Sequence, residues 1–184
     1  MMSLVALLVA APFTLSSQSK VVIDGDSSLH KWSCTASVAQ TSAELDTSLP
    51  QLVRALTVQI PVAGIECGNG TMNGKLRDAL GADKHPIIEY RFSSAERIDG
   101  EGVRLRATGT LTVAGKSQPL IVPVDAALDT DGSAIAMGSV SFAMSQFGIE
   151  PPTAMLGVLT TADRVTIRFE LRALPSRAPH ASLP

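Results

Sequence analysis

The sequence of 184 residues has little charge, few aromatic side chains and only two cysteines. Its 15 Lys and Arg residues are balanced by 17 Asp and Glu residues, so it lacks the basic excess of a typical nucleic-acid-binding domain. Two cysteines are too few for a disulfide-rich scaffold or for a zinc site built from thiolates alone. Because 45% of the residues are hydrophobic and only 17% are charged, most of the chain is not disordered. The composition predicts one domain with a full core and no nucleic-acid partner.

The N-terminus carries an apolar run that is too short to cross a membrane as a helix. Residues 1–15 contain no charged side chain, but a spanning helix needs about 20 apolar residues. An apolar run of this length, followed by small and polar residues, is typical of a secretory signal. The usual preceding Lys or Arg is missing, and a disordered or buried N-terminal segment is the alternative. We therefore predict export, with residues 1–17 as a signal peptide, and no stable membrane insertion.

From Lys20 onward, apolar and polar residues alternate with a period of two in segment after segment. In residues 103–113, Val, Leu and Ala occupy one face and Arg and Thr the other. Such alternation indicates antiparallel strands with one buried and one solvated face. The segments with this pattern are residues 20–25, 28–40, 54–62, 87–97, 102–113, 119–130, 134–146 and 163–173.

These segments are long, and short turns such as residues 99–102 and 114–116 join them in sequence order. Long antiparallel strands with short connections predict an all-β fold, an up-and-down barrel of about eight strands. Closure would also remove the exposed edges that long strands create. A two-sheet sandwich is the alternative, because periodicity does not report closure.

One segment, residues 70–80, has the apolar spacing of a helix instead. Asn69 or Thr71 can cap its start, and Gly81 can supply a left-handed residue after its end. Residues 147–157 contain adjacent prolines and no period, which predicts an ordered loop. We expect the helix and this loop to cover a barrel opening. Residues 175–184 are expected to form a flexible C-terminal tail.

The sequence holds no recognisable catalytic or metal-binding pattern. His30, His85 and His180 have no partners at ligand spacing, and no GxSxG nucleophile motif is present. Residues 68–70 resemble a phosphate loop only superficially, because the Lys-Ser/Thr continuation is missing. We therefore expect no enzyme activity, no metal and no cofactor.

Cys34 and Cys67 form either a disulfide or two buried thiols. Cys34 lies on the apolar face of its predicted strand, and Cys67 lies just before the predicted helix. In an exported protein a single pair is normally oxidised, which would tie the helix to the barrel. We predict the disulfide, although the sequence does not show the Cα separation that a bridge requires. In the alternative, the two thiols act as small hydrophobes.

Four stretches together resemble the YceI-like family of polyisoprenoid-binding periplasmic proteins. They are SLHKW at residues 28–32, CGNGTMNGKLRDALGADKHPIIEY at 67–90, GTLTVAG at 109–115 and FGIEPPT at 147–153. The resemblance spans about residues 20–173, so residues 18–174 are expected to form a YceI-like lipid-binding domain. It implies a lipocalin-like barrel in the bacterial periplasm that holds a long isoprenoid-type lipid. Cys34 and Cys67 are not part of the general family pattern and look like a subgroup feature.

The inward positions of the predicted strands independently favour a hollow interior. Ala36, Ala107, Gly109 and Ala126 are small, and large rings are few. A barrel of about eight strands either fills itself with side chains or holds one small ligand. An apolar void binds hydrocarbon, because each buried methylene contributes about 0.8 kcal/mol. The alternative is a fully packed core without a cavity.

We therefore predict non-enzymatic binding of a polyisoprenoid or isoprenoid quinone inside the barrel, for storage or transport in the periplasm. The alternatives are an enzyme and a structural envelope protein with a packed core, and a homodimer stays open. The predicted ligand contacts are the apolar inward residues and those that close the barrel end: Trp32, Val58, Ile60, Met72, Leu76, Tyr90, Phe92, Leu105, Leu111, Val122, Phe142, Met144, Ile149, Met155, Leu156, Ile167 and Phe169.

Overall fold

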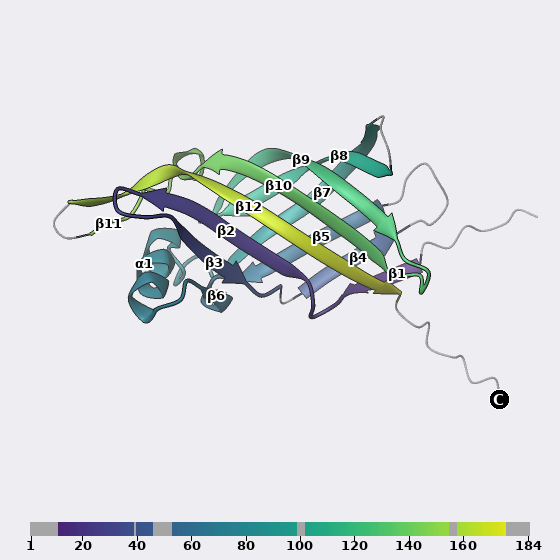
Figure 1. The fold of residues 1–184 in the computed structure, drawn as a ribbon, viewed down its shortest axis with the longest axis horizontal. Coiled ribbons are helices and arrows are strands. Elements are labelled where there is room, and N and C mark those ends of the chain that lie inside the picture. Colours follow the sequence, from purple (N-terminus) through teal and green to yellow (C-terminus); the bar gives the residue numbers. More distant parts are fainter. Residues whose placement is uncertain (1–10, 39, 46–52, 99–101, 155–157, 176–184) are drawn as a thin grey trace, which may run out of the picture.

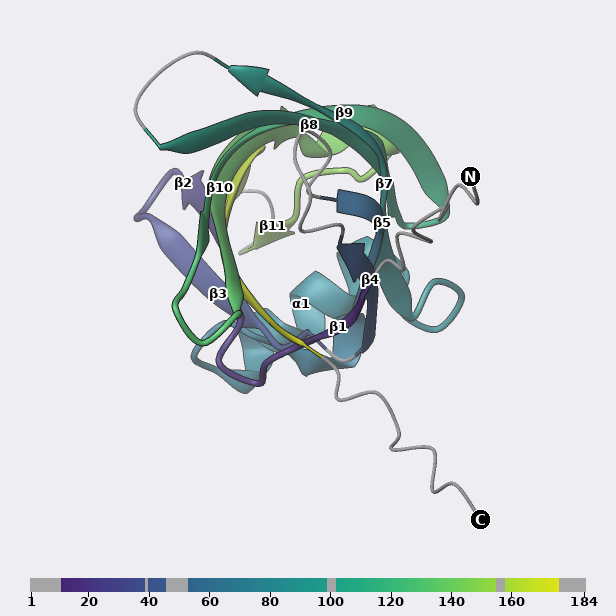
Figure 2. The ribbon, with the colours of Figure 1, turned by 90° about the vertical axis from the view of Figure 1, so that its right-hand side faces the viewer.

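The described part of the chain folds into a nearly closed antiparallel β-barrel with a single α-helix at one end (Figures 1 and 2). The structure is a computed structural model that describes residues 11–38, 40–45, 53–98, 102–154 and 158–175. The longer strands are β2 (Lys20–Ser27), β5 (Val53–Pro61), β7 (Ile87–Ile98), β8 (Val103–Val113), β9 (Lys116–Leu128), β10 (Ala134–Ala143) and β12 (Leu159–Pro175). The shorter strands are β1 (Ala11–Leu15), β3 (Trp32–Ala36), β4 (Gln40–Leu45), β6 (Ile65–Glu66) and β11 (Thr153–Ala154).

The strands follow one another around the barrel wall largely in sequence order. The order is β1-β4-β5-β7-β8-β9-β10-β12-β2-β3-β6, and β1 also pairs with β12. The second pairing of β1 completes a ring of hydrogen-bonded strands. This confirms the predicted up-and-down barrel and removes most of the sheet edge.

Strands β1 and β2 run along successive parts of β12, on either side of a bend at residues 16–19. Ser19 holds this bend, because its hydroxyl accepts a hydrogen bond from the Arg172 N–H (3.0 Å) and donates one to the Arg172 carbonyl (3.4 Å). β1 lies within residues 1–17, the stretch for which the sequence predicts a signal peptide.

The predicted strand at residues 28–40 is wrong in extent, because only residues 32–36 form β3 and residue 40 is the first residue of β4. Gly25 pairs with Trp32, and residues 28–31 form the loop between the end of β2 at Ser27 and the start of β3. The Ser27 hydroxyl closes this loop, since it accepts from the His30 N–H and donates to the His30 carbonyl. β3 then ends at Ala36, and β4 begins at Gln40.

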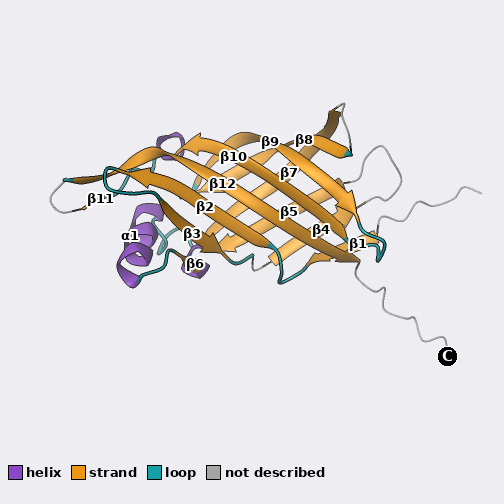
Figure 3. Cartoon of the chain, viewed as in Figure 1, coloured by secondary structure: helices purple, strands orange, loops and turns teal. Residues whose placement is uncertain are grey.

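The predicted helix is present as α1 (Gly70–Leu80), at the left-hand end of the barrel in Figures 1 and 3. Of the two predicted caps it uses Asn69, whose side chain accepts a hydrogen bond from the Met72 N–H (2.9 Å). The helix ends at Gly81 in the left-handed conformation, with φ of 61°.

Two short elements lie between β10 and β12 and overlap the predicted ordered loop at residues 147–157. The 3₁₀ helix η2 (Met144–Phe147) ends at Gly148, which has φ of 67°, and β11 follows. A second 3₁₀ helix, η1 (Val62–Gly64), lies between β5 and β6. Phe147 and Ile149 are buried against Leu111 and Val165, so this stretch forms part of the core.

Candidate functional site

The interior of the barrel contains an elongated apolar cavity of about 700 Å³. Side chains from every long strand and from α1 line it, reaching from Leu15 of β1 to Met72 and Leu76 of the helix. The volume falls within the range of sites that enclose a small-molecule ligand, about 300–1,000 Å³. The interior is therefore hollow and not fully packed.

The structure brings the predicted contact residues together around this cavity. Those that line it are Trp32, Val58, Ile60, Met72, Leu76, Tyr90, Phe92, Leu105, Leu111, Val122, Phe142, Met144, Ile149, Ile167 and Phe169. Met155 and Leu156 lie outside the described residues. Sequence reasoning does not predict Leu15 as a lining residue, because its strand lies in the stretch that has the pattern of a signal peptide.

Polar lining residues gather where α1 meets the loops of the barrel end. This group comprises Ser27, His30, Thr71, Lys75, Thr153, Thr160 and Thr161. Lys75 is the only formally charged residue among the described lining residues, and its ammonium donates to the Thr153 carbonyl (3.2 Å). The cavity thus has an apolar body and a polar end near Lys75, a pattern that suits an amphipathic ligand.

Three glycines on the inward faces make room for aromatic rings against the wall. A Cβ at Gly25 would lie 2.1 Å from Cζ2 of Trp32, far inside van der Waals contact. A Cβ at Gly138 would lie 2.5 Å from Cζ of Phe169. A Cβ at Gly109 would likewise lie 2.5 Å from Cζ of Tyr90. Because these rings occupy the space above glycines, they take up less of the lumen. Sequence alternation could not reveal this arrangement.

Tyr90 has a buried hydroxyl with no hydrogen-bond partner within the described part of the chain. Burial raises the pKa of this phenol, so it stays protonated at neutral pH. An unpaired buried hydroxyl is costly, and it marks Tyr90 as a donor placed in the cavity wall.

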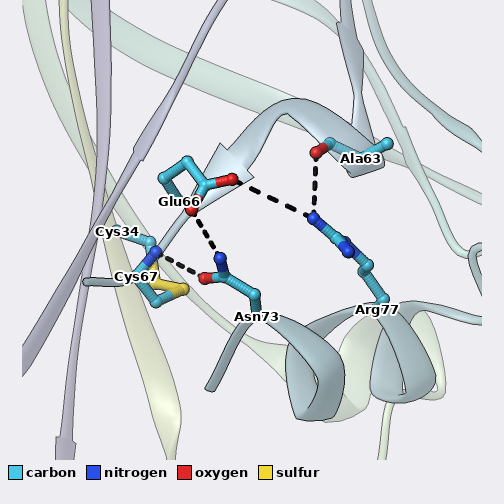
Figure 4. A network of polar contacts seen from close by, with 6 residues as sticks. All are labelled: Cys34, Ala63, Glu66, Cys67, Asn73 and Arg77. Carbon is cyan, nitrogen blue, oxygen red and sulfur yellow. Dashed lines mark hydrogen bonds and ion pairs between the residues drawn. A yellow bond between two sulfur atoms is a disulfide. The ribbon is translucent and has the colours of Figure 1, made fainter. Parts of the chain in front are cut away.

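The start of α1 is fixed to the barrel by one disulfide and a set of polar contacts (Figure 4). Cys34 of β3 is bonded to Cys67, which confirms the predicted bridge. The buried Asn73 side chain accepts from the Cys67 N–H (2.8 Å) and donates to the Glu66 carboxylate. One turn further, Arg77 donates to the Ala63 carbonyl (3.2 Å). The helix end of the cavity is therefore held covalently as well as by hydrogen bonds.

The described residues contain no cluster of side chains that could form a metal centre beside the cavity. Nowhere among them do three His, Cys, Asp or Glu side chains gather as a metal site would require. His85 packs its ring over the turn at Gly115, where a Cβ would lie 2.4 Å from the ring, and His180 lies outside the described residues. The described part of the chain also contains no helix that is long and apolar enough to span a membrane.

Solved structures of three bacterial proteins share this fold. BcnA of Burkholderia cenocepacia superposes with a TM-score of 0.73 at 22% identity, over 85% of this chain and 97% of BcnA. A polyisoprenoid binding domain from Saccharophagus degradans, implicated in plant cell wall breakdown, gives 0.71 at 12% identity, over 91% and 100%. The Campylobacter jejuni YceI protein gives 0.60 at 23% identity, over 78% and 85%. At such low identities the likeness shows the fold alone.

A search of curated proteins found no match. The sequence profile of the YceI-like domain, however, matches residues 14–173, which include the last residues of β1 and nearly all of β12. That match covers most of the chain and agrees with the barrel, so the protein belongs to the YceI-like family.

Proposed function

We propose that the barrel binds one long apolar lipid, of the polyisoprenoid or isoprenoid-quinone class, without catalysing a reaction. The observation that carries this proposal is the apolar cavity of about 700 Å³ that runs from β1 to α1. The Saccharophagus degradans domain of the same fold is described as polyisoprenoid binding, which supports the same class of ligand.

Binding would draw on the hydrophobic effect along the whole cavity. Each methylene removed from water contributes about 0.8 kcal/mol, so a long chain binds tightly without a charged partner. The polar group around Lys75 and Thr153 would leave the head of the lipid at the α1 end.

The proposed place of action is the bacterial periplasm, where the protein would store or transport its lipid. The apolar N-terminal run supports export, and the Cys34–Cys67 bridge suits an oxidising compartment. Cleavage after residue 17 would remove β1, which pairs with both β4 and β12.

The test is to extract and identify the lipid from protein purified from its own periplasm. Native mass spectrometry should show one lipid per chain, and organic extraction should release an isoprenoid-type molecule. Ala107→Phe, which fills the cavity from an inward position, should abolish the bound mass, whereas Thr108→Phe on the neighbouring outward position should retain it. Protein that carries no lipid and takes none up from vesicles would contradict the proposal and favour a structural role.

A further inference from the structure

The barrel wall is incompletely paired between β9 and β10. The β8–β9 ladder is continuous over the full length of β8, from Val103 to Val113. The β9–β10 ladder, in contrast, ends at the pair Val124–Gly138. Residues 139–143 of β10 still pair with β12 on their other side. We call residues 119–123 and 139–143, where β9 and β10 are not paired with each other, the seam.

Two prolines account for the seam. Ala114 and Gly115 form a two-residue turn with φ of 48° and 74°, so Val113 and Lys116 form a hydrogen-bonded pair. Counting in steps of two from Lys116, the even-numbered residues of β9 bond to β8 and the odd-numbered ones face β10. Pro119 and Pro123 are both odd-numbered and have no N–H to donate. β9 therefore loses two donors on the edge that faces β10.

The seam separates the apolar cavity from solvent by a single layer of side chains. Leu120 and Val122 on β9, and Val140 and Phe142 on β10, line the cavity at this level. The outward residue between them on β9, Ile121, is 59% exposed. A hydrocarbon chain that passed between the strands would thus meet Ile121 of β9 and the exposed Ser139 and Ser141 of β10 on the outside, and apolar side chains from both strands on the inside.

Both ends of the seam are held closed. At one end the ladder resumes at Val124 and Gly138. At the other, the Gln118 side-chain amide donates to the Gln146 carbonyl of η2 (2.9 Å). Separating the strands between these points breaks no backbone ladder. Opening the α1 end instead would have to displace a helix that is tied by the Cys34–Cys67 disulfide.

From this geometry we infer that the seam is the side opening through which the lipid tail enters and leaves the barrel. The inference rests on the proposed lipid binding and adds the route of exchange. A route through the wall lets a long chain slide in sideways while α1 stays in place.

The test restores the missing donors in the double variant Pro119→Thr/Pro123→Thr. Both positions are exposed, and Thr favours strands. Transfer of a pyrene-labelled polyprenol from phosphatidylcholine vesicles should slow by about tenfold or more, because two added hydrogen bonds must break at each opening. Equilibrium uptake should stay as in the parent chain. Ile121→Thr, which changes the seam surface but adds no donor, should exchange at the parental rate.

Hydrogen exchange at the amides of Ile121 and Ser141, which would form the next hydrogen-bonded pair beyond Val124–Gly138, reports whether the ladder has extended. Greater protection together with slower transfer supports the seam as the route. Greater protection with an unchanged rate of lipid transfer would show that the seam is not the route. Unchanged protection would also contradict the inference, because it would show that the prolines do not keep the strands apart. A parent chain that takes up no lipid at all would instead refute the proposed function, and with it the need for a route.

Discussion

Neighbouring residues of β9 face opposite environments, and this decides what a substitution does. Val122 is 4% exposed and lines the cavity, whereas Ile121 is 59% exposed on the outside. Val122→Asp places an unpaired charge in an apolar site and should lower the free energy of unfolding by about 3 kcal/mol or more. Ile121→Asp adds the same charge in water and should change it by about 0.5 kcal/mol or less. Urea unfolding followed by Trp32 fluorescence measures both, and equal losses would show that the inward face is misassigned.

A second residue-scale prediction concerns the ring above Gly25. Gly25→Ala would bring a Cβ to 2.1 Å from the Trp32 ring, so the ring must move toward the lumen. Overpacking of this kind should cost about 1–3 kcal/mol of stability, and the emission of Trp32, the only tryptophan, should shift. In a Trp32→Leu background the same alanine should cost much less. A loss as large as in the parent background would mean that the backbone, and not the ring, rejects the side chain.

Among the secondary-structure elements, those with strong periodicity were predictable from the sequence. β7, β8 and β10 follow the period of two, and α1 follows the helical period between two recognisable caps. β1 was not predictable as a strand, because apolar residues at an N-terminus fit an export signal equally well. The cavity could be predicted as an apolar interior with small residues, but its extent could not, because the ring positions over Gly25 and Gly138 depend on contacts across strands.

An ion pair between β2 and β12 should make stability depend on pH in the acid range. Arg168 donates to both carboxylate oxygens of Asp24, at 2.6 and 3.1 Å. The Arg168 hydrogen bond holds the pKa of Asp24 below its ordinary value of 3.8. The stabilisation is therefore complete above about pH 4 and is lost as the pH falls through the lowered pKa.

In Asp24→Asn this acid-dependent loss should shrink, as measured by urea unfolding from pH 7 to pH 2. The change should be small, because both side chains are partly exposed. Asp125→Asn, which removes the outer Arg104–Asp125 pair between β8 and β9, is the matched comparison. An unchanged pH profile in Asp24→Asn would show that this pair does not contribute to the acid dependence.

Apolar side chains of the helix α1 cover one end of the cavity. Leu76 lines the cavity and is half-buried. Leu76→Gln should weaken lipid binding by about tenfold, because an amide would face hydrocarbon. The stability of the lipid-free protein should change little. Asp78→Gln, on the exposed side of the same helix, should leave binding unchanged. A loss of several kcal/mol in lipid-free Leu76→Gln would show that the helix packs into a solid core instead.

For the molecule as a whole, closure of the barrel depends on β1 at the end opposite α1. β1 pairs with β4 on one side and with the C-terminal part of β12 on the other. Phe13 is 5% exposed and packs with Ala173, Leu15 and Leu56, so it fills the barrel where the ring closes. Leu15 of β1 lines the cavity at this end, so β1 also forms part of the cavity wall.

Phe13→Ala should therefore lower the free energy of unfolding by about 3 kcal/mol or more, because it removes a large side chain from a buried cluster. Leu174→Ala, at an exposed position of β12 that pairs with Thr14, should change it by about 0.5 kcal/mol or less. Both are measured by urea unfolding on protein exported from its own host, with the N-terminus established by intact mass. If the two alanine variants are equally stable, β1 is not docked in the exported protein. The strand ring described above then lacks its closing strand, as it would if export removed residues 1–17.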